Sequence, residues 1–291
     1  MDLPQLDALA AAVDTGTFEA AARALNVTPS AISQRIRTLE NSVGGVLLTR
    51  GKPVTVTAAG VPYLRLARQI EALAADAAAE AAHEKRTPFP VIPLAINGDS
   101  LATWALPALA SLAGDLTFDI HREDQDHSWD LLRDGTVMAA LTTEARPVQG
   151  CTSTRLGVMR YRPMATPGFV ARWFGGGVTA SALGRAPVVV FDRKDDIQDR
   201  YLRGFGVEQD PPRHYVPAST EFAEAVRLGM GWAMLPDQQS TGPESRGELV
   251  ELAGGTPELV ELYWQQWALH TSALDRVAEA IAAAARDLTH S

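Results

Sequence analysis

In the first sixty positions, the side chains best suited to recognise another molecule are four polar ones: Ser30, Ser33, Gln34 and Arg37. Their spacing of i, i+3, i+4 and i+7 places them on one side of a helix, and Ile32, Ile36 and Leu39 fall on the other side. Gln and Arg side chains reach base edges in the DNA major groove, and Ser can contact bases or phosphate. The pattern therefore predicts a recognition helix. A solvated helix of an ordinary helical domain is the alternative.

The elements around this face predict a winged helix-turn-helix. Apolar periodicity indicates one helix from Leu3 to a stop near Thr15-Gly16 and a second over about residues 18–25. Thr28 is a natural N-cap for the third helix, and a proline follows at the first helical position. After that helix, "GGVLLTRGKPVTVT" indicates two short strands with basic residues at the turn. The DNA-contacting set predicted from this arrangement is Thr28, Pro29, Ser30, Ser33, Gln34, Arg37, Arg50 and Lys52.

The distribution of charge agrees with a nucleic-acid partner. The chain has a net charge of −9, yet residues 23–68 carry seven basic side chains and one acid, Glu40. A locally basic segment in an acidic protein is expected when one domain meets phosphates and the remainder stays away from them.

The stretch from Phe18 to Arg50 resembles the N-terminal domain of the LysR-type transcriptional regulators. That family's pattern is AA-x-x-L-x-x-[ST]-x-[SP]-A-[VIL]-S-x-x-I-x-x-LE, which Ala21-Ala22 through Leu39-Glu40 fill. Leu48 and Arg50 stand where the family usually has Phe-x-Arg, a small departure. The resemblance implies a DNA-binding transcriptional regulator, active as a homodimer and as a homotetramer, with double-stranded operator DNA as its partner.

The chain divides at a long alanine-rich helix. We expect a DNA-binding domain over residues 1–57, a helix over 58–86 that Thr57 caps, and a second domain over 87–291 that follows the prolines of "KRTPFPVIP". A long helix of small side chains is a connector or a dimer seam, and the resemblance implies both. A helix packed within one subunit is the alternative.

The second domain alternates apolar runs with helical patterns, which predicts an α/β fold. The resemblance implies two Rossmann-like subdomains like those of periplasmic binding proteins. Subdomain I would comprise 88–160 and 265–291, and subdomain II would comprise 161–264. A ligand would then bind in the cleft between them.

Several residues at strand ends and helix starts are candidates for that cleft. Ser100 and Ser219-Thr220 open helices, where free amides suit a carboxylate, although simple N-capping is the alternative for each. A single acid that follows a strand is usually an ordinary turn residue. Several such acids around one cleft would instead favour a ligand with a cationic side chain. The sequences "NGDSLATWALPALA" and "APVVVFDRKDD" resemble the ArgP/LysG branch of the family, which senses basic amino acids and controls their export. The effector-binding set predicted on these grounds is Asp99, Ser100, Thr103, Trp104, Glu123, Asp124, Thr142, Glu144, Asp192, Ser219 and Thr220.

The sequence contains none of the common catalytic motifs. It has no G-x-S-x-G elbow, Walker loop or G-x-G-x-x-G helix opening, and no metal-ligand spacing around His121 or His127. We therefore expect no enzyme activity, no metal and no cofactor. One cysteine, the acidic start and the absence of a long apolar run predict a cytoplasmic protein without a membrane partner. A regulator of another small carboxylate, a solute-binding protein without DNA and an α/β enzyme remain as alternatives.

Overall fold

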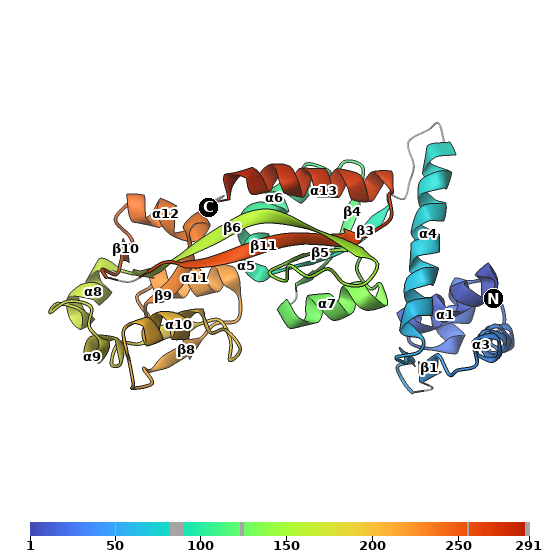
Figure 1. Cartoon of the computed structure of the whole chain (residues 1–291), viewed down its shortest axis with the longest axis horizontal. Helices are drawn as coiled ribbons and strands as arrows, with labels where there is room; N and C mark the ends of the chain where they lie inside the picture. Colours follow the sequence, from blue (N-terminus) through green and yellow to red (C-terminus); the bar gives the residue numbers. More distant parts are fainter. Residues whose placement is uncertain (50, 82–89, 123–124, 255, 289–291) are drawn as a thin grey trace.

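The computed structural model describes residues 1–49, 51–81, 90–122, 125–254 and 256–288. Figure 1 shows a small N-terminal unit, a long upright helix beside it, and a larger α/β region crossed by two long strands. Within the described ranges, no helix is long and apolar enough to cross a membrane. The arrangement confirms the predicted fold class: a winged helix-turn-helix, a linker helix and an α/β domain of two lobes.

The N-terminal unit consists of three helices and a two-stranded wing, α1 Leu3–Thr15, α2 Phe18–Ala24, α3 Pro29–Val43, β1 Leu48–Thr49 and β2 Thr55–Val56. The expected apolar periodicity forms its core, in which Leu9, Ala21 and Ile36 are buried. Leu3, placed in the apolar stripe of the first helix by its spacing, is instead 55% exposed, because it lies in the first turn beyond the reach of the core.

The long helix α4, Val61–Ala81, begins three residues later than predicted. The Thr57 hydroxyl accepts a hydrogen bond from the Gly60 amide at 3.1 Å, so residues 58–60 form a turn before the helix. Gly60 lies so close to the wing that a Cβ there would be 2.2 Å from the Leu47 carbonyl oxygen. The start of α4 is therefore held against the N-terminal unit.

Subdomain I contains three parallel strands and several helices. Its elements are β3 Val91–Ile96, α5 Gly98–Ser100, the π-helical turn Leu101–Ala105, α6 Leu106–Ala110, β4 Thr117–Arg122, α7 Gln125–Asp134, β5 Ala139–Thr142, α13 Ser272–Ala284 and the 3₁₀ turn Ala285–Asp287. Strand β3 lies between β4 and β5 and is parallel to both.

Two long antiparallel strands, β6 Cys151–Ala165 and β11 Glu258–Trp267, connect the subdomains. Subdomain II contains α8 Pro167–Trp173, α9 Ala180–Leu183, β7 Val188–Val190, α10 Ile197–Gly204, β8 Arg213–Tyr215, α11 Ser219–Arg227, β9 Ala233–Pro236, α12 Asp237–Ser245 and β10 Val250–Glu251. The expected boundaries at residues 161 and 264 fall inside β6 and β11. These strands belong to both lobes, as Figure 1 shows.

Candidate functional site

The predicted recognition face is exposed on α3. Ser30, Gln34 and Arg37 are exposed and Ser33 is half-buried, whereas Ile32, Ile36 and Leu39 are buried in the unit's core. Thr28 caps the helix, since its Oγ1 accepts from the Ala31 amide at 3.2 Å. Thr28 and Pro29 are exposed at the start of the same helix. The helix thus presents a polar face that is free to enter a groove.

Glu40, the acid within this basic segment, is turned away from that face. Its Oε1 accepts a hydrogen bond from the Leu47 amide at 2.9 Å, so the carboxylate holds the end of α3 against the wing. At the wing tip, Lys52 is exposed. Arg50, the other predicted wing contact, lies outside the described residues.

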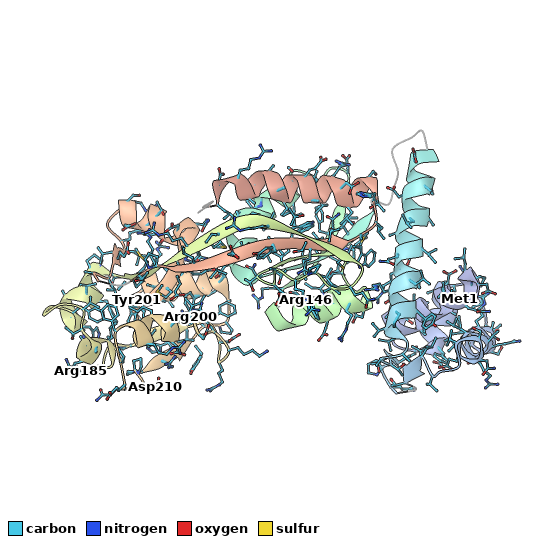
Figure 2. All side chains as sticks on the ribbon, in the orientation of Figure 1. Met1, Arg146, Arg185, Arg200, Tyr201 and Asp210 are labelled. Atoms are coloured by element: carbon cyan, nitrogen blue, oxygen red, sulfur yellow. The ribbon has the colours of Figure 1, made fainter. Side chains whose placement is uncertain are left out.

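A cavity of about 500 Å³ lies between the two subdomains. Its acidic lining comes from Asp99 in α5 and from Asp192, Asp195 and Asp196 in the segment between β7 and α10. Tyr161 of β6, Phe191 and Phe222 add aromatic walls. In Figure 2, Arg200, which also lines this cavity, lies on the lobe opposite Arg146. A cavity of this size between two lobes is typical of a small-molecule site.

Asp99 binds hydroxyl groups from two different elements. Its Oδ2 accepts from the Tyr161 hydroxyl at 2.8 Å, and its Oδ1 accepts from Ser219 Oγ at 2.6 Å. Burial raises the pKa of Tyr161 well above its usual value, and the nearby Asp99 charge raises it further, so Tyr161 remains a proton donor. Both carboxylate oxygens of Asp99 are therefore bound by neutral hydroxyl donors.

Asp195 is the second internal carboxylate of the cavity. It accepts from the Phe191 and Ile197 amides at 3.2 and 3.1 Å. Gln198 also donates to Asp195 Oδ2, at 2.9 Å, when its side-chain amide is oriented with the nitrogen toward the carboxylate. Burial raises the pKa of Asp195, while the hydrogen bonds from the two amides each lower it by a smaller amount. The charges of Asp99 and Asp192 raise the pKa further. The cavity therefore concentrates negative charge.

Only part of this charge is neutralised within the described chain. Asp196 pairs with Arg200, which also pairs with Glu258. Asp192 accepts from the Lys194 and Asp195 amides. Among the described residues, Asp99, Asp192 and Asp195 have no ion-pair partner. Three carboxylates around one cavity create an electrostatic environment that favours a cation.

Several predicted effector residues are displaced from the cavity. Asn97, not Asp99, caps the helix after β3, and Ser100 is fully buried with its hydroxyl 3.6 Å from the Met159 sulfur. The expectation that Ser100 faces the cleft is therefore not met, because the helix begins at Gly98 and turns Ser100 into the core. Thr103 Oγ1 donates to the Asp99 carbonyl oxygen at 2.6 Å. Trp104 packs against the main core.

The other predicted effector residues that the structure describes, apart from Asp192, are absent from the cavity lining. Thr142 is buried and accepts from the Glu144 amide, while its neighbour Thr143 lines the cavity. Glu144 is exposed. Helix α11 begins at Ser219, two residues before the expected start, and leaves Thr220 exposed. Glu123 and Asp124 lie outside the described residues.

Sequence reasoning missed Asp195 and Tyr161. Asp195 lies three residues after Asp192 in the same stretch. A second acid so soon after a buried strand could have indicated that Asp195 also lies at the cleft. Tyr161 lies in the middle of the long strand β6 and gave no signal, because its role depends on Asp99, 62 residues away.

Cys151 is the only cysteine of the sequence, and its reactivity depends on the pKa of its thiol. Burial raises the pKa of the Cys151 thiol to about 11, against a smaller lowering by Arg65, so it is a poor nucleophile. Over the described parts of the chain, no three His, Cys, Asp or Glu residues gather as a metal site.

Two family models together match most of the chain. The bacterial regulatory helix-turn-helix protein of the lysR family matches residues 3–61, and the LysR substrate binding domain matches residues 94–286. The lysine export transcriptional regulatory protein LysG of Corynebacterium efficiens is 41% identical over 97% of this chain and 97% of its own length.

Two solved structures cover the whole chain. ArgP from Mycobacterium tuberculosis has a TM-score of 0.93 and 43% identity, over 100% of this chain and 99% of that one. Full-length LysG from Corynebacterium glutamicum, solved with the effector Arg bound, has a TM-score of 0.86 and 35% identity, over 100% of both chains.

Proposed function

This chain belongs to the LysR family of bacterial transcriptional regulators, and on that premise we propose that it senses arginine or lysine, with histidine as a further candidate. The predicted transcriptional regulator is thereby confirmed over the alternatives of an enzyme and a solute-binding protein. The proposed effector site is the cavity between the subdomains. We also propose that the regulated gene encodes an amino-acid exporter, as the name of the Corynebacterium efficiens relative suggests.

One observation carries the effector proposal: Asp99, Asp192 and Asp195 line one cavity and form no ion pair among the described residues. With Asp196 they outnumber the two cations of the lining, Lys194 and Arg200. An arginine or lysine has two positive groups and one negative group, so it brings a net positive charge into a cavity whose lining carries more carboxylates than cations. A ligand without a side-chain cation leaves carboxylates buried and unpaired, which penalises binding steeply. The arginine bound to the LysG relative supports the same class of ligand.

On the DNA side, we propose that α3 enters the major groove. Ser33, Gln34 and Arg37 would contact bases, Ser30 would contact base or phosphate at the helix start, and Lys52 would contact the backbone from the wing. Thr28 and Pro29 would position the helix start, since the Thr28 hydroxyl is used in the cap. A protein bound to chromosomal DNA works in the cytoplasm, which we propose as its location.

For assembly, we propose a homodimer through α4, with pairing of dimers into a tetramer. The second half of α4 leaves small apolar side chains in solvent, and Leu73 is 45% exposed. A two-fold axis along this helix would place two recognition helices on one face of the operator.

The effector proposal is tested by isothermal titration of the purified protein with arginine, lysine, leucine and glutamate. Binding of the two basic amino acids, with no heat from leucine or glutamate, is expected. Equal binding of leucine, or binding of none of the four, would refute a cation-selective cavity.

A further inference from the structure

Two arginines of the basic segment are directed at the effector domain rather than at DNA. Arg65 Nη1 of α4 donates to the Gln149 carbonyl oxygen at 2.5 Å. Arg68 Nη1 donates to the Asp134 carbonyl oxygen at 3.3 Å and to Thr136 Oγ1 at 3.2 Å. Both arginines therefore bind loops of subdomain I.

Arg68 also contacts the DNA-binding unit. Its Nη2 pairs with the Asp14 carboxylate at the end of α1. The Arg68 side chain is 16% exposed and that of Asp14 is 48% exposed, so only the Arg68 end of the pair is shielded from solvent. One guanidinium thus joins three parts of the chain: α1, α4 and the loop between α7 and β5.

The first half of α4 is a rigid extension of the DNA-binding unit. Leu64 and Ala67 are buried in the core of that unit, and Gly60 lies tightly against Leu47. The angle between α1 and α4 is consequently fixed by packing. What remains adjustable is the angle between this combined body and the effector domain.

The effector domain is shaped to receive α4. Gly135 has a φ of +79°, and a Cβ at this position would lie 3.1 Å from the Arg65 Cα, so a larger residue would strain both the backbone and the approach of α4. Farther along the helix, Asp76 Oδ1 accepts from the Ser272 amide and hydroxyl, each at 3.0 Å, at the start of α13. Arg65 and Asp76 are eleven residues apart, or about 16 Å along a helix. The contacts of Arg65 and Asp76, this far apart on α4, together fix the orientation of the helix relative to the effector domain.

The anchor at Arg68 is connected to the effector cavity by a single strand. Thr136 lies in the loop that leads into β5, Ala139–Thr142, and the next residue, Thr143, lines the cavity. We propose that Arg68 is a positioning residue that sets the angle between the DNA-binding unit and the effector domain. The accompanying claim, that an effector in the cavity acts on DNA through these contacts, rests on the proposed function.

The first claim is tested without any ligand. Spin labels at Glu19→Cys and Ser111→Cys, both exposed, report the distance between the two bodies in a Cys151→Ser background. Doubly labelled chains are diluted into excess unlabelled protein so that only distances within one chain are measured. The parent protein is expected to give one narrow distance distribution by pulsed electron paramagnetic resonance.

Arg68→Gln and Asp14→Asn are both expected to broaden that distribution. The two substitutions change the net charge in opposite directions, so a general electrostatic effect would not produce the same result in both. Arg133→Gln is the matched control, because Arg133 pairs only with Asp130 of its own helix among the described contacts. A distribution as narrow as the parent's in either Arg68→Gln or Asp14→Asn would overturn the positioning role.

The second claim is tested on operator DNA with arginine as the probe. The Arg68→Gln protein should bind arginine with the parent's affinity and should lose the arginine-dependent change in the DNA footprint. A footprint that still changes as in the parent would overturn the coupling. Failure of the parent to bind arginine would refute the effector proposal and, with it, this second claim, while the ligand-free distance result would still decide the positioning role.

Discussion

The Ser219 hydroxyl at the start of α11 donates a 2.6 Å hydrogen bond to Asp99, which lies in the short helix α5 of the other subdomain. The contact spans the cleft between the lobes. Gln239 of α12 donates in turn to Ser219 Oγ at 2.9 Å. Neutral donors position the Asp99 carboxylate without an ion pair among the described residues, and the same contacts tie the two lobes together.

Replacement of Asp99 by Asn should weaken arginine binding by about 10- to 100-fold, since a hydrogen bond to a charged group contributes about 1.5–3 kcal/mol. The Asn side chain keeps the shape but has one acceptor oxygen, so the hydrogen bond from either Tyr161 or Ser219 is lost and the melting temperature should fall slightly. Titration calorimetry measures the affinity, and Thr220→Ala, at an exposed neighbour of Ser219, is the control. An Asp99→Asn protein that binds arginine as tightly as the parent would remove Asp99 from the site.

Arginine affinity should depend on pH through Asp195. Burial and the charges of Asp99 and Asp192 raise the pKa of Asp195 above its ordinary 3.8. The ionised form is therefore disfavoured in the folded protein, and a cation beside it favours ionisation. Affinity should accordingly fall, and proton release on binding should appear, as the pH is lowered from about 7.5 toward the raised pKa.

The Asp195→Asn protein should show weaker binding with a flatter pH dependence than the parent. Because Asp195 also orders the Phe191 and Ile197 amides, Asp192→Asn serves as a second variant that leaves those bonds intact. If the pH profile of Asp195→Asn matches that of the parent, Asp195 is not the group that titrates.

On α3, Gln34→Ala should weaken binding to the specific operator by about 1–3 kcal/mol, with little effect on random DNA. Lys52→Ala on the wing should weaken binding to both DNAs alike and reduce the salt dependence. Fluorescence anisotropy at several salt concentrations separates the two effects. Equal losses on operator and random DNA for Gln34→Ala would show that this residue does not read sequence.

Introduction of a charge on α4 should disrupt assembly. Leu73→Glu places a carboxylate in the proposed helix seam, where burial without a partner is unfavourable. The variant dimer should therefore dissociate at protein concentrations at which the parent is still dimeric. Leu228→Glu, at an exposed leucine just after α11, is the matched control. Analytical ultracentrifugation compares the two. Unchanged assembly of Leu73→Glu would place the dimer interface elsewhere.

The features that sequence predicts well are local. The polar face of α3, its Thr28 cap and its buried Ile32 and Ile36 follow from spacing within one helix, and the structure contains all of them. Residue type alone does not determine the cap after β3, because Asn97 and Asp99 can both cap a helix, and Asn97 occupies the position.

The features that sequence does not predict depend on distant contacts. Arg65 and Arg68 add to the basic charge that indicated DNA, yet their partners Gln149 and Thr136 lie 84 and 68 residues along the chain. Likewise, the contact between Asp99 and Ser219 joins residues 120 positions apart. Composition reports how many charges a segment has, and only the fold determines what they face.

The central claim is that the cavity between the subdomains selects a cationic amino acid. The most direct measurement is the affinity of arginine against that of citrulline, which has nearly the same shape and a neutral side chain. We predict that arginine binds at least about 10-fold more tightly, because citrulline leaves a buried carboxylate without a cation. Equal affinities for arginine and citrulline would contradict the claim.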